Sequence, residues 1–359
     1  MGIRAKGDIL HDPQFRLTCA GRFAVWEIMK FILKTPLDMH THLRDGAMLN
    51  LVAPHTARQF SAAVVMPNLL PPVNSLEAVI SYRQRIAKAI GDEAFKPLMT
   101  VFFRDFSESE LEQLKDEIIA VKLYPDGVTT NSAGGVTSLR DAERILEMME
   151  ALDIPLMVHG ETDGFVLNRE TEFLKIYERW AMKFPKLRIT MEHITTARAV
   201  KLLNEHKNLR ATVTLHHLVL TLDDLIGGNL NPHHFCKPVV KRPEDREALM
   251  EAALEGHSKL MFGSDSAPHP RSAKECAHGA AGIFSAPVLL PCLVQFFEQH
   301  NSLENLQAFV SNNAKKLYRL RNLPKKEVVL TKERQQVPEM VGDVVPMYAG
   351  KFLKWQIKN

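Results

Sequence analysis

Short apolar runs recur along the 359-residue chain. Between most of them lie segments whose apolar residues recur at the spacing of a helix. The runs lie at residues 31–37, 62–66, 97–103, 118–123, 155–158, 187–191, 211–215 and 259–262. Each is typical of a buried strand. Apolar residues at helical spacing lie at 75–90, 107–116, 138–152, 172–183, 196–205 and 243–254. Eight strands alternating with helices predict an α/β fold, a (β/α)8 or TIM barrel.

Three stretches depart from this alternation. Residues 126–135 are rich in Gly, Thr and Ser and predict a long loop after the fourth strand, at the face of the barrel where loops often act as lids. Residues 221–242 form a long irregular passage before the last strand. After the last strand, helices are expected at 286–300 and 303–317, followed by a tail to 359. Residues 1–28 lack a clear period, so we expect a non-native or irregular extension, with a native strand or arm as the alternative. Residues 29–359 are then one barrel catalytic domain.

Composition narrows the class of protein. Hydrophobic residues make up 45% and charged residues 24%, the net charge is +3, and no basic block indicates nucleic-acid binding. No apolar stretch is long enough to predict a membrane span. The cysteines Cys19, Cys236, Cys276 and Cys292 lack CxxC spacing, which argues against a disulfide framework or zinc-thiolate site and favours a reducing cytoplasm.

Six metal-type side chains fall where the predicted strands end. The carboxyl ends of barrel strands form the mouth in which these folds carry out their chemistry. Four imidazoles and one carboxylate there suit zinc or a similar divalent ion. Hydrogen-bonded structural histidines and a turn aspartate are the alternative. The six residues are His40, His42, Lys122, His159, His193 and Asp265.

Lys122 is the unusual member of this set. An ammonium beside metal ions would be repelled, whereas burial and positive neighbours lower the pKa of an amine. A neutral amine can react with carbon dioxide to give an anionic carbamate, whose two oxygens can bridge two metals. An ordinary lysine paired with an acid is the alternative.

Seven motifs occur in an order that resembles a known family. They are DMHTHLRDG, VVMPNLLPP, VKLYPDGVTTNS, VHGE, EHITT, KPVVKR and GSDSAPH. From about residue 31 to the C-terminus, the chain is similar to dihydroorotases of the short bacterial (class II) type within the amidohydrolase superfamily. The resemblance implies a barrel with two zinc ions. By it, His40, His42 and Asp265 hold one ion, His159 and His193 hold the other, and carboxylated Lys122 bridges them.

The resemblance also implies an activity and a substrate site. Members of this family reversibly cyclise N-carbamoyl-L-aspartate to L-dihydroorotate in pyrimidine biosynthesis, and they suggest a cytoplasmic homodimer. The implied substrate-binding residues are Arg44, Asn68, Thr129, Thr130, His159, Lys237, His269 and Ala281.

These residues divide by role. Arg44, Asn68 and His269 match positions that hold the substrate carboxylate, for which a guanidinium fork and an amide are suited. Thr129 and Thr130 match the tip of a loop that closes over the ligand. A surface ion pair, a turn cap and exposed loop residues are the alternative roles.

Two departures from the family pattern concern the backbone groups expected to bind the ring amides. Lys237 stands where the family often has an apolar residue, and residues 277–282 (AHGAAG), which include Ala281, differ from a cysteine-containing version. A backbone contact tolerates both changes.

Asp265 is expected to act as metal ligand, base and acid, transferring the proton between the attacking water and the departing nitrogen. Rival hypotheses are a hydantoinase or dihydropyrimidinase, whose substrates lack the ring carboxylate, and an inactive barrel that serves as a scaffold.

Overall fold

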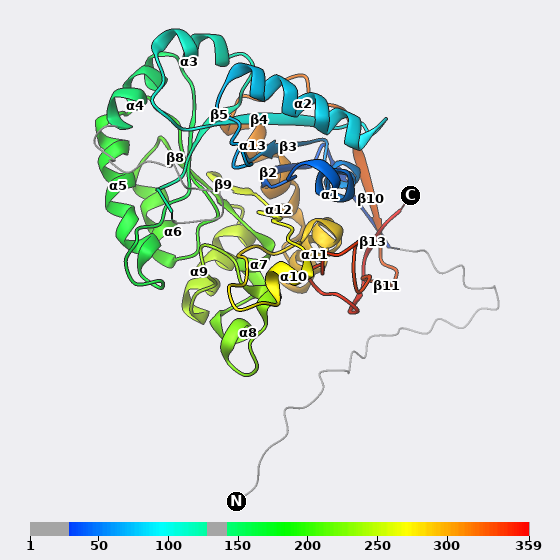
Figure 1. Ribbon diagram of the computed structural model, residues 1–359. Helices are drawn as coiled ribbons and strands as arrows, with labels where there is room; N and C mark the ends of the chain where they lie inside the picture. The colour runs from blue at the N-terminus through cyan, green and yellow to red at the C-terminus, as the bar shows by residue number, and fades with distance from the viewer. Residues whose placement is uncertain (1–28, 128–141, 359) are drawn as a thin grey trace, which may run out of the picture.

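The structure is a computed structural model that describes residues 29–127 and 142–358 (Figure 1). The expected N-terminal extension at 1–28 and most of the expected lid, including Thr129 and Thr130, lie outside the described residues. Within the described ranges, no helix is both long and apolar enough to cross a membrane.

A parallel eight-stranded sheet forms the centre of the described structure, with strands in chain order. The strands are β2 (Leu37–Thr41), β3 (Ala62–Val65), β4 (Lys96–Phe102), β5 (Ala120–Leu123), β6 (Leu156–Val158), β7 (Ile189–Met191), β8 (Leu209–Val213) and β9 (Leu260–Phe262). The sheet closes where Thr41 bridges Ser266, and Asp265 N donates to His40 O across this seam at 2.8 Å. The predicted α/β barrel is thus confirmed.

Helices surround the barrel, as the outer ring in Figure 1 shows. The crossover helices are α1 (Gly46–Gln59), α2 (Leu76–Ile90), α3 (Glu108–Leu114), α4 (Ala142–Ala151), α5 (Arg169–Lys183), α6 (Ala197–Glu205) and α9 (Pro243–Leu254). Ser75 caps α2 through a hydrogen bond from Ala78 N, and Thr196 caps α6 through one from Ala199 N. Both helix starts agree with the prediction, because these side chains satisfy backbone N–H groups that lack helical partners.

The passage predicted as irregular contains α7 (Leu215–Val219), α8 (Leu222–Ile226) and η1 (Pro232–His234). After β9 come α10 (Arg271–Lys274), η2 (Ala286–Val288) and α11 (Leu289–Gln299). They precede α12 (Leu303–Gln307), the π-helical turn η3 (Ala308–Asn312) and α13 (Asn313–Leu317). The expected helix at 303–317 is therefore one helical stretch with a π-turn in the middle.

The prediction for the first barrel strand is wrong. The apolar run at 31–37 is divided: β1 (Lys30–Lys34) pairs with β10 (Glu327–Thr331), which also pairs with β13 (Gln356–Ile357), in a separate antiparallel sheet. Thr35 has a φ of 51° and Pro36 has no N–H to donate, so the chain turns between the two strands. The barrel strand is β2. Two further short strands, β11 (Gln335–Gln336) and β12 (Phe352–Leu353), pair near the C-terminus.

Alternation along the strands separates the barrel interior from the layer under the helices. On β3, Ala62 and Val64 belong to the interior cluster, whereas Ala63 and Val65 pack into the larger cluster under the helices. On β5, Ala120 faces the interior, so Lys122 does too, because alternate residues share a face. The fold therefore directs the lysine side chain into the barrel.

Candidate metal centre and active site

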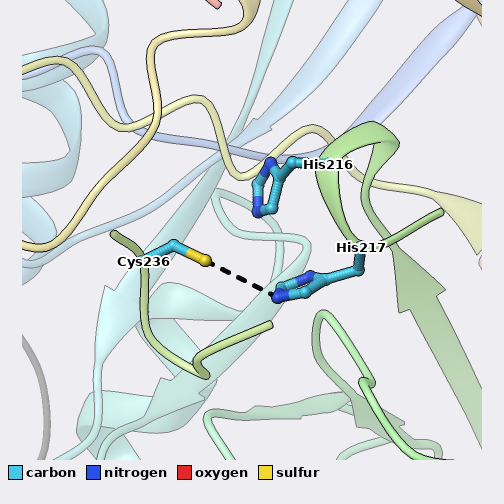
Figure 2. Close-up of side chains that lie close together, drawn as sticks. All are labelled: His216, His217 and Cys236. Carbon is cyan, nitrogen blue, oxygen red and sulfur yellow. Dashed lines mark hydrogen bonds between the residues drawn. The ribbon is translucent and has the colours of Figure 1, made fainter. Parts of the chain in front are cut away.

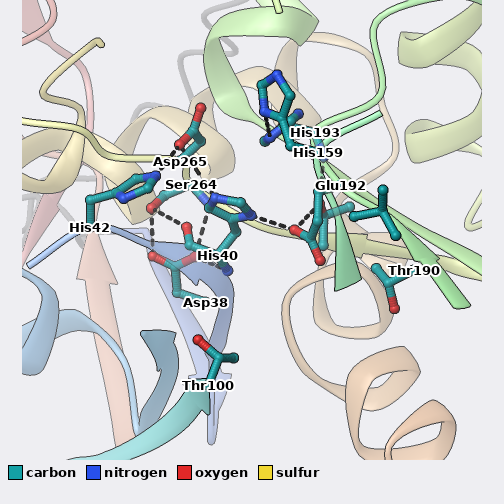
Figure 3. A network of polar contacts seen from close by, with 12 residues as sticks. Asp38, His40, His42, Thr100, His159, Thr190, Glu192, His193, Ser264 and Asp265 are labelled. Carbon is teal, nitrogen blue, oxygen red and sulfur yellow. Dashed lines mark hydrogen bonds and ion pairs between the residues drawn. The ribbon is translucent and has the colours of Figure 1, made fainter. Parts of the chain in front are cut away.

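Three metal-type side chains meet at the barrel seam (Figure 3). His40 is the penultimate residue of β2, His42 directly follows the strand, and Asp265 comes from the segment after β9. The Asp265 Oδ1 atom lies 3.5 Å from His40 Nε2 and 3.0 Å from His42 Nε2. One atom of each side chain therefore converges on one small region, within 4.8 Å of the others.

Two further imidazoles adjoin this group. His159 follows β6 and His193 follows β7, and His159 Nδ1 lies 3.1 Å from His193 Nε2. The ring of His193 has its centroid 5.0 Å from that of His40. The four histidines predicted from strand ends thus form one continuous cluster.

Lys122 lies in the same buried region. It is fully buried, and its Nζ has no hydrogen-bond partner among the described residues. Nζ lies 4.9 Å above the centroid of the Tyr124 ring. Burial lowers the pKa of Lys122 to about 8, against the opposing effect of Glu192 and Asp265. An unpartnered buried amine near its neutral form is what carboxylation requires.

The electrostatics of the cluster favour metal binding over free imidazolium groups. Burial lowers the pKa of His40, and lowers the pKa values of His42 and His193 well below their ordinary value. Neutral imidazole is the form that binds a metal. Burial also raises the pKa of Asp265. In the described residues, His193 Nδ1 has no hydrogen-bond partner and is available as a ligand atom. The donor set therefore fits zinc.

Carboxylates and hydroxyls behind the cluster orient it. The Glu192 carboxylate is hydrogen-bonded to His40 Nδ1, and Thr212 Oγ1 donates to Glu192 Oε2 at 2.9 Å. Asp38 accepts hydrogen bonds from His40 N and from both Ser264 N and Ser264 Oγ. A ring nitrogen held by a carboxylate leaves the other nitrogen directed at the metal position.

Sequence reasoning did not identify these supporting residues, although a signal was present. Asp38 lies two residues before His40, Tyr124 two after Lys122, and Glu161 two after His159. Residues two apart share a face of a strand, as Asp38 and His40 do on β2. Beyond the end of β6, the structure places His159 Nε2 2.8 Å from Glu161 Oε2.

A cavity at the barrel mouth joins the cluster to the expected carboxylate site. Its lining includes Arg44, Asn68, His159, Lys237 and Ala281 beside the metal-type side chains. Five of the predicted substrate-binding residues are therefore brought to one cavity.

Arg44 is held in a defined orientation. Its backbone has a φ of 58°, Tyr82 Oη donates to its carbonyl at 2.7 Å, and its Nε donates to Pro268 O at 3.0 Å. Left-handed backbone at a non-glycine residue is strained and clusters at functional sites. The guanidinium is therefore fixed before any ligand binds.

His269 lies beside Arg44. Its Nε2 is 3.0 Å from Arg44 Nη2 and 3.0 Å from Ala281 O. Burial, and then the charge of Arg44, lowers the pKa of His269 to about 3. A neutral ring nitrogen either accepts from the guanidinium or donates to the carbonyl, so the tautomer selects one contact.

A second histidine group, His216 and His217, lies beside Cys236, which precedes the cavity-lining residue Lys237 in the chain (Figure 2). His217 Nδ1 pairs with Thr214 Oγ1 at 2.9 Å and its Nε2 pairs with Pro238 O at 3.0 Å, while Cys236 Sγ donates to Pro238 O at 3.3 Å. Burial lowers the pKa of His217 to about 4. The neighbouring His216 has no hydrogen bond from either ring nitrogen within the described ranges. Because both ring nitrogens of His217 are hydrogen-bonded to protein atoms, His217 connects the start of α7 to the loop at Pro238.

Comparison with known proteins shows the family to which the chain belongs. A model of the amidohydrolase family matches residues 31–323, and the chain belongs to this family.

Within the family, several relatives with high sequence identity are dihydroorotases. The dihydroorotase of Helicobacter hepaticus is 45% identical over 335 residues, which cover 91% of this chain and 97% of that protein. The crystal structure of Campylobacter jejuni dihydroorotase has 54% identity and a TM-score of 0.88, covering 93% of this chain and 98% of that one. Saccharomyces cerevisiae dihydroorotase, in complex with 5-fluoroorotic acid, has 36% identity and a TM-score of 0.86, with 92% and 98% covered.

Proposed function

We propose that this chain is a zinc-dependent dihydroorotase, which interconverts N-carbamoyl-L-aspartate and L-dihydroorotate. One observation carries the proposal: a single cavity holds both the His–Asp cluster and the fixed guanidinium of Arg44. The cluster supplies hydrolytic chemistry, and the guanidinium matches a substrate that bears a carboxylate. The likeness to dihydroorotases supports the same reading.

Two zinc ions are proposed. His40, His42 and Asp265 would hold one, and His159 and His193 would hold the other. Lys122 would lie between them as a carbamate: its amine nitrogen bonds to the carbon of carbon dioxide and releases one proton. The buried, unpartnered Nζ and the lowered pKa of Lys122 support this step. When bound, zinc makes hydroxide available near neutral pH and polarises the ring carbonyl.

Asp265 carries the proton in this proposal. During ring opening its carboxylate accepts the proton of the attacking water and delivers it to the departing ring nitrogen. During ring closure it takes a proton from the ureido nitrogen and delivers it to the carboxyl oxygen that leaves as water.

Substrate orientation depends on the other side of the cavity. The Arg44 guanidinium and the Asn68 amide would bind the ring carboxylate, with His269 beside them. The backbones of Lys237 and Ala281 would bind the ring amide groups, because both residues line the same cavity. Thr129 and Thr130, outside the described residues, are proposed to cover the bound substrate.

The test is a ring-opening assay with metal analysis on the same sample. We expect turnover of L-dihydroorotate and about two zinc ions per chain. Zinc-loaded protein that opens dihydrouracil but not dihydroorotate would support a hydantoinase or dihydropyrimidinase instead. Protein that takes up no metal from a zinc-supplemented medium would support the inactive-scaffold alternative.

Arg44→Met provides the matched specificity test. The variant should raise KM for dihydroorotate by about 10–100-fold, because one charge-assisted pair contributes roughly 1.5–3 kcal/mol. Turnover of dihydrouracil, if detectable, should not change, since that ring carries no carboxylate. Equal KM values for dihydroorotate in both proteins would remove the assigned role of Arg44.

The assembly and location are also proposals. Residues 29–359 are proposed to form one catalytic domain that pairs as a homodimer in the cytoplasm. The free thiols of Cys236, Cys276 and Cys292 agree with a reducing compartment. Light scattering of the purified protein tests the dimer, and the mass of a single chain would contradict it.

A further inference from the structure

We propose that Lys274 is a positioning residue that clamps the two loops carrying Lys237 and Ala281, and so sets the affinity for the ring amides of the substrate. The inference rests on the proposed function and assigns a role to a residue outside the metal cluster and the carboxylate site.

Lys274 makes an unusual set of contacts for a buried lysine. It ends α10 and is only 5% exposed. Its Nζ donates to Phe235 O at 3.1 Å, to Ala280 O at 3.0 Å and to Gly282 O. An ammonium has three N–H donors, and each of them has a backbone carbonyl as its acceptor.

The absence of a counter-ion makes this arrangement costly. No carboxylate forms an ion pair with Lys274 in the part of the chain that the structure describes. Burying an unpaired charge is unfavourable, and burial accordingly lowers the pKa of Lys274 to about 8. Since the buried ammonium of Lys274 forms no ion pair, its structural role lies in the three backbone carbonyls to which it donates hydrogen bonds.

The three acceptors belong to the two loops that supply cavity-lining residues. Gly282 lines the cavity itself, Ala280 directly precedes the lining residue Ala281, and Phe235 lies two residues before the lining residue Lys237. The same two loops are joined by a hydrogen bond from Gly282 N to Phe235 O at 2.8 Å. Lys274 therefore lies behind the seam between the loops and holds both of them through their carbonyls.

The loop at Gly282 is restricted because its backbone packs closely against Ala267. Gly282 has a φ of 149°, and a Cβ at this position would lie 2.5 Å from Ala267 O. The close approach places the backbone of Ala281 against the segment that follows Asp265. A shift of this loop would move Ala281 away from the metal cluster.

The other loop is held at both ends. Lys274 holds the Phe235 carbonyl, while His217 and Cys236 hold the Pro238 carbonyl. Lys237 lies between these two anchors. These two anchors hold the backbone on either side of Lys237.

Loss of the Lys274 hydrogen bonds should lower the affinity for substrate more than it lowers the rate of the chemical step. If the loops occupy the binding geometry only part of the time, the apparent Kd rises by the inverse of that fraction. The metal ligands and Asp265 do not contact Lys274, so the rate of the bound complex should change little.

The experiment compares Lys274→Met with wild type and with Lys259→Met. Lys259 Nζ also donates to backbone carbonyls, those of Leu203 and His206, but far from the cavity walls. We expect Lys274→Met to raise KM for dihydroorotate about 10-fold or more, with kcat within about 3-fold of wild type and zinc content unchanged. Lys259→Met should lower Tm without changing KM.

Binding of 5-fluoroorotic acid, measured by calorimetry, supplies a readout that does not depend on turnover. Its Kd should rise in Lys274→Met and stay constant in Lys259→Met. Where the methionine variant fails to fold, Lys274→Gln replaces it, because the amide keeps two N–H donors. A folded variant at position 274 with wild-type KM and Kd overturns the inference. Inactive wild-type protein in this assay would instead count against the proposed function.

Discussion

At the scale of single residues, Asp265 has the most demanding position. Its Oδ1 faces the imidazoles of His40 and His42, and its carboxyl borders the cavity. Asp265→Asn keeps the shape and one oxygen ligand but cannot carry a proton. We expect kcat to fall by about 10²–10⁴-fold while the fold persists. Zinc content and thermal unfolding are measured on the same sample.

Asp153→Asn is the control for this change, because Asp153 is exposed and pairs with Arg188 and Arg319 away from the cavity. It should retain wild-type kcat. A zinc-loaded Asp265→Asn variant with near-normal turnover would contradict the proton-transfer role.

Lys274 leads to a prediction about pH. Its pKa is lowered by burial to about 8, so above this pH the amine has two N–H donors for three carbonyls. KM for dihydroorotate should therefore rise above about pH 8 in wild type and show no such step in Lys274→Met. KM is measured in both proteins from about pH 6 to about pH 10.

The groups around Lys274 do not titrate in that window. Burial raises the pKa of Cys236 to about 12, that of His269 is lowered to about 3, and Arg44 remains charged. Rising pH should have opposite effects on substrate binding, which weakens, and on the free energy of unfolding, which increases. Because the unfolded lysine binds its proton more tightly, the cost of burying Lys274 shrinks as pH rises from about 8 towards 10.5. A pH step that is identical in both proteins would assign it to another group.

Residue types and their spacing predicted which metal-type side chains gather at the barrel mouth. The contacts that these side chains make with residues far away in the sequence were not predictable. His40, His159 and His193 each follow an apolar run, which is a local signal. The carboxylate of Glu192 reaches His40 from a different strand, and Lys274 reaches Phe235 through the folding of two loops. Such partners are set by the closure of the barrel, which no local pattern encodes.

At the scale of elements, a buried glutamate connects two helices below His193. Glu170, in the first turn of α5, accepts hydrogen bonds from Thr195 N at 2.8 Å, Thr195 Oγ1 at 2.6 Å and Thr196 Oγ1 at 2.6 Å. Glu170→Ala leaves these donors without their acceptor. We expect the free energy of unfolding to fall by about 2–4 kcal/mol. Urea denaturation measures it.

Glu178→Ala on the same helix is the matched control, because Glu178 is exposed. It should change stability by less than about 0.5 kcal/mol. Equal stability of the two variants would show that the contacts of Glu170 contribute nothing net.

Caps and breakers made the long elements predictable. Ser75, Thr196 and Pro243 each mark a helix start in the sequence and in the structure. Helix α1 was not predicted: it contains Pro54 and begins at a glycine. The run at 31–37 gave a wrong strand because apolar character alone does not distinguish a barrel strand from β1, whose partner β10 lies near the other end of the chain.

At the scale of the whole molecule, metal and fold should be linked. Buried imidazoles gathered from β2, β6 and β7 are stabilised by a cation that binds only the folded state. Zinc at about 100 times its Kd adds about 2.7 kcal/mol to the free energy of unfolding. Chelation should therefore lower Tm, and added zinc should restore it.

Magnesium is the control cation, because it prefers oxygen ligands and should not restore Tm. Metal analysis must show that the chelator has removed the zinc. A protein that has lost its zinc and melts at the original temperature would contradict the linkage.

The seam between β2 and the segment after β9 has a consequence for biosynthesis. His40 emerges early from the ribosome, but Asp265 and the bridge from Thr41 to Ser266 become available only after most of the polypeptide has been made. A nascent or prematurely terminated chain thus holds histidines with no opposing carboxylate. Catalytic competence should arise late in translation, and truncated products should be inert towards the substrate.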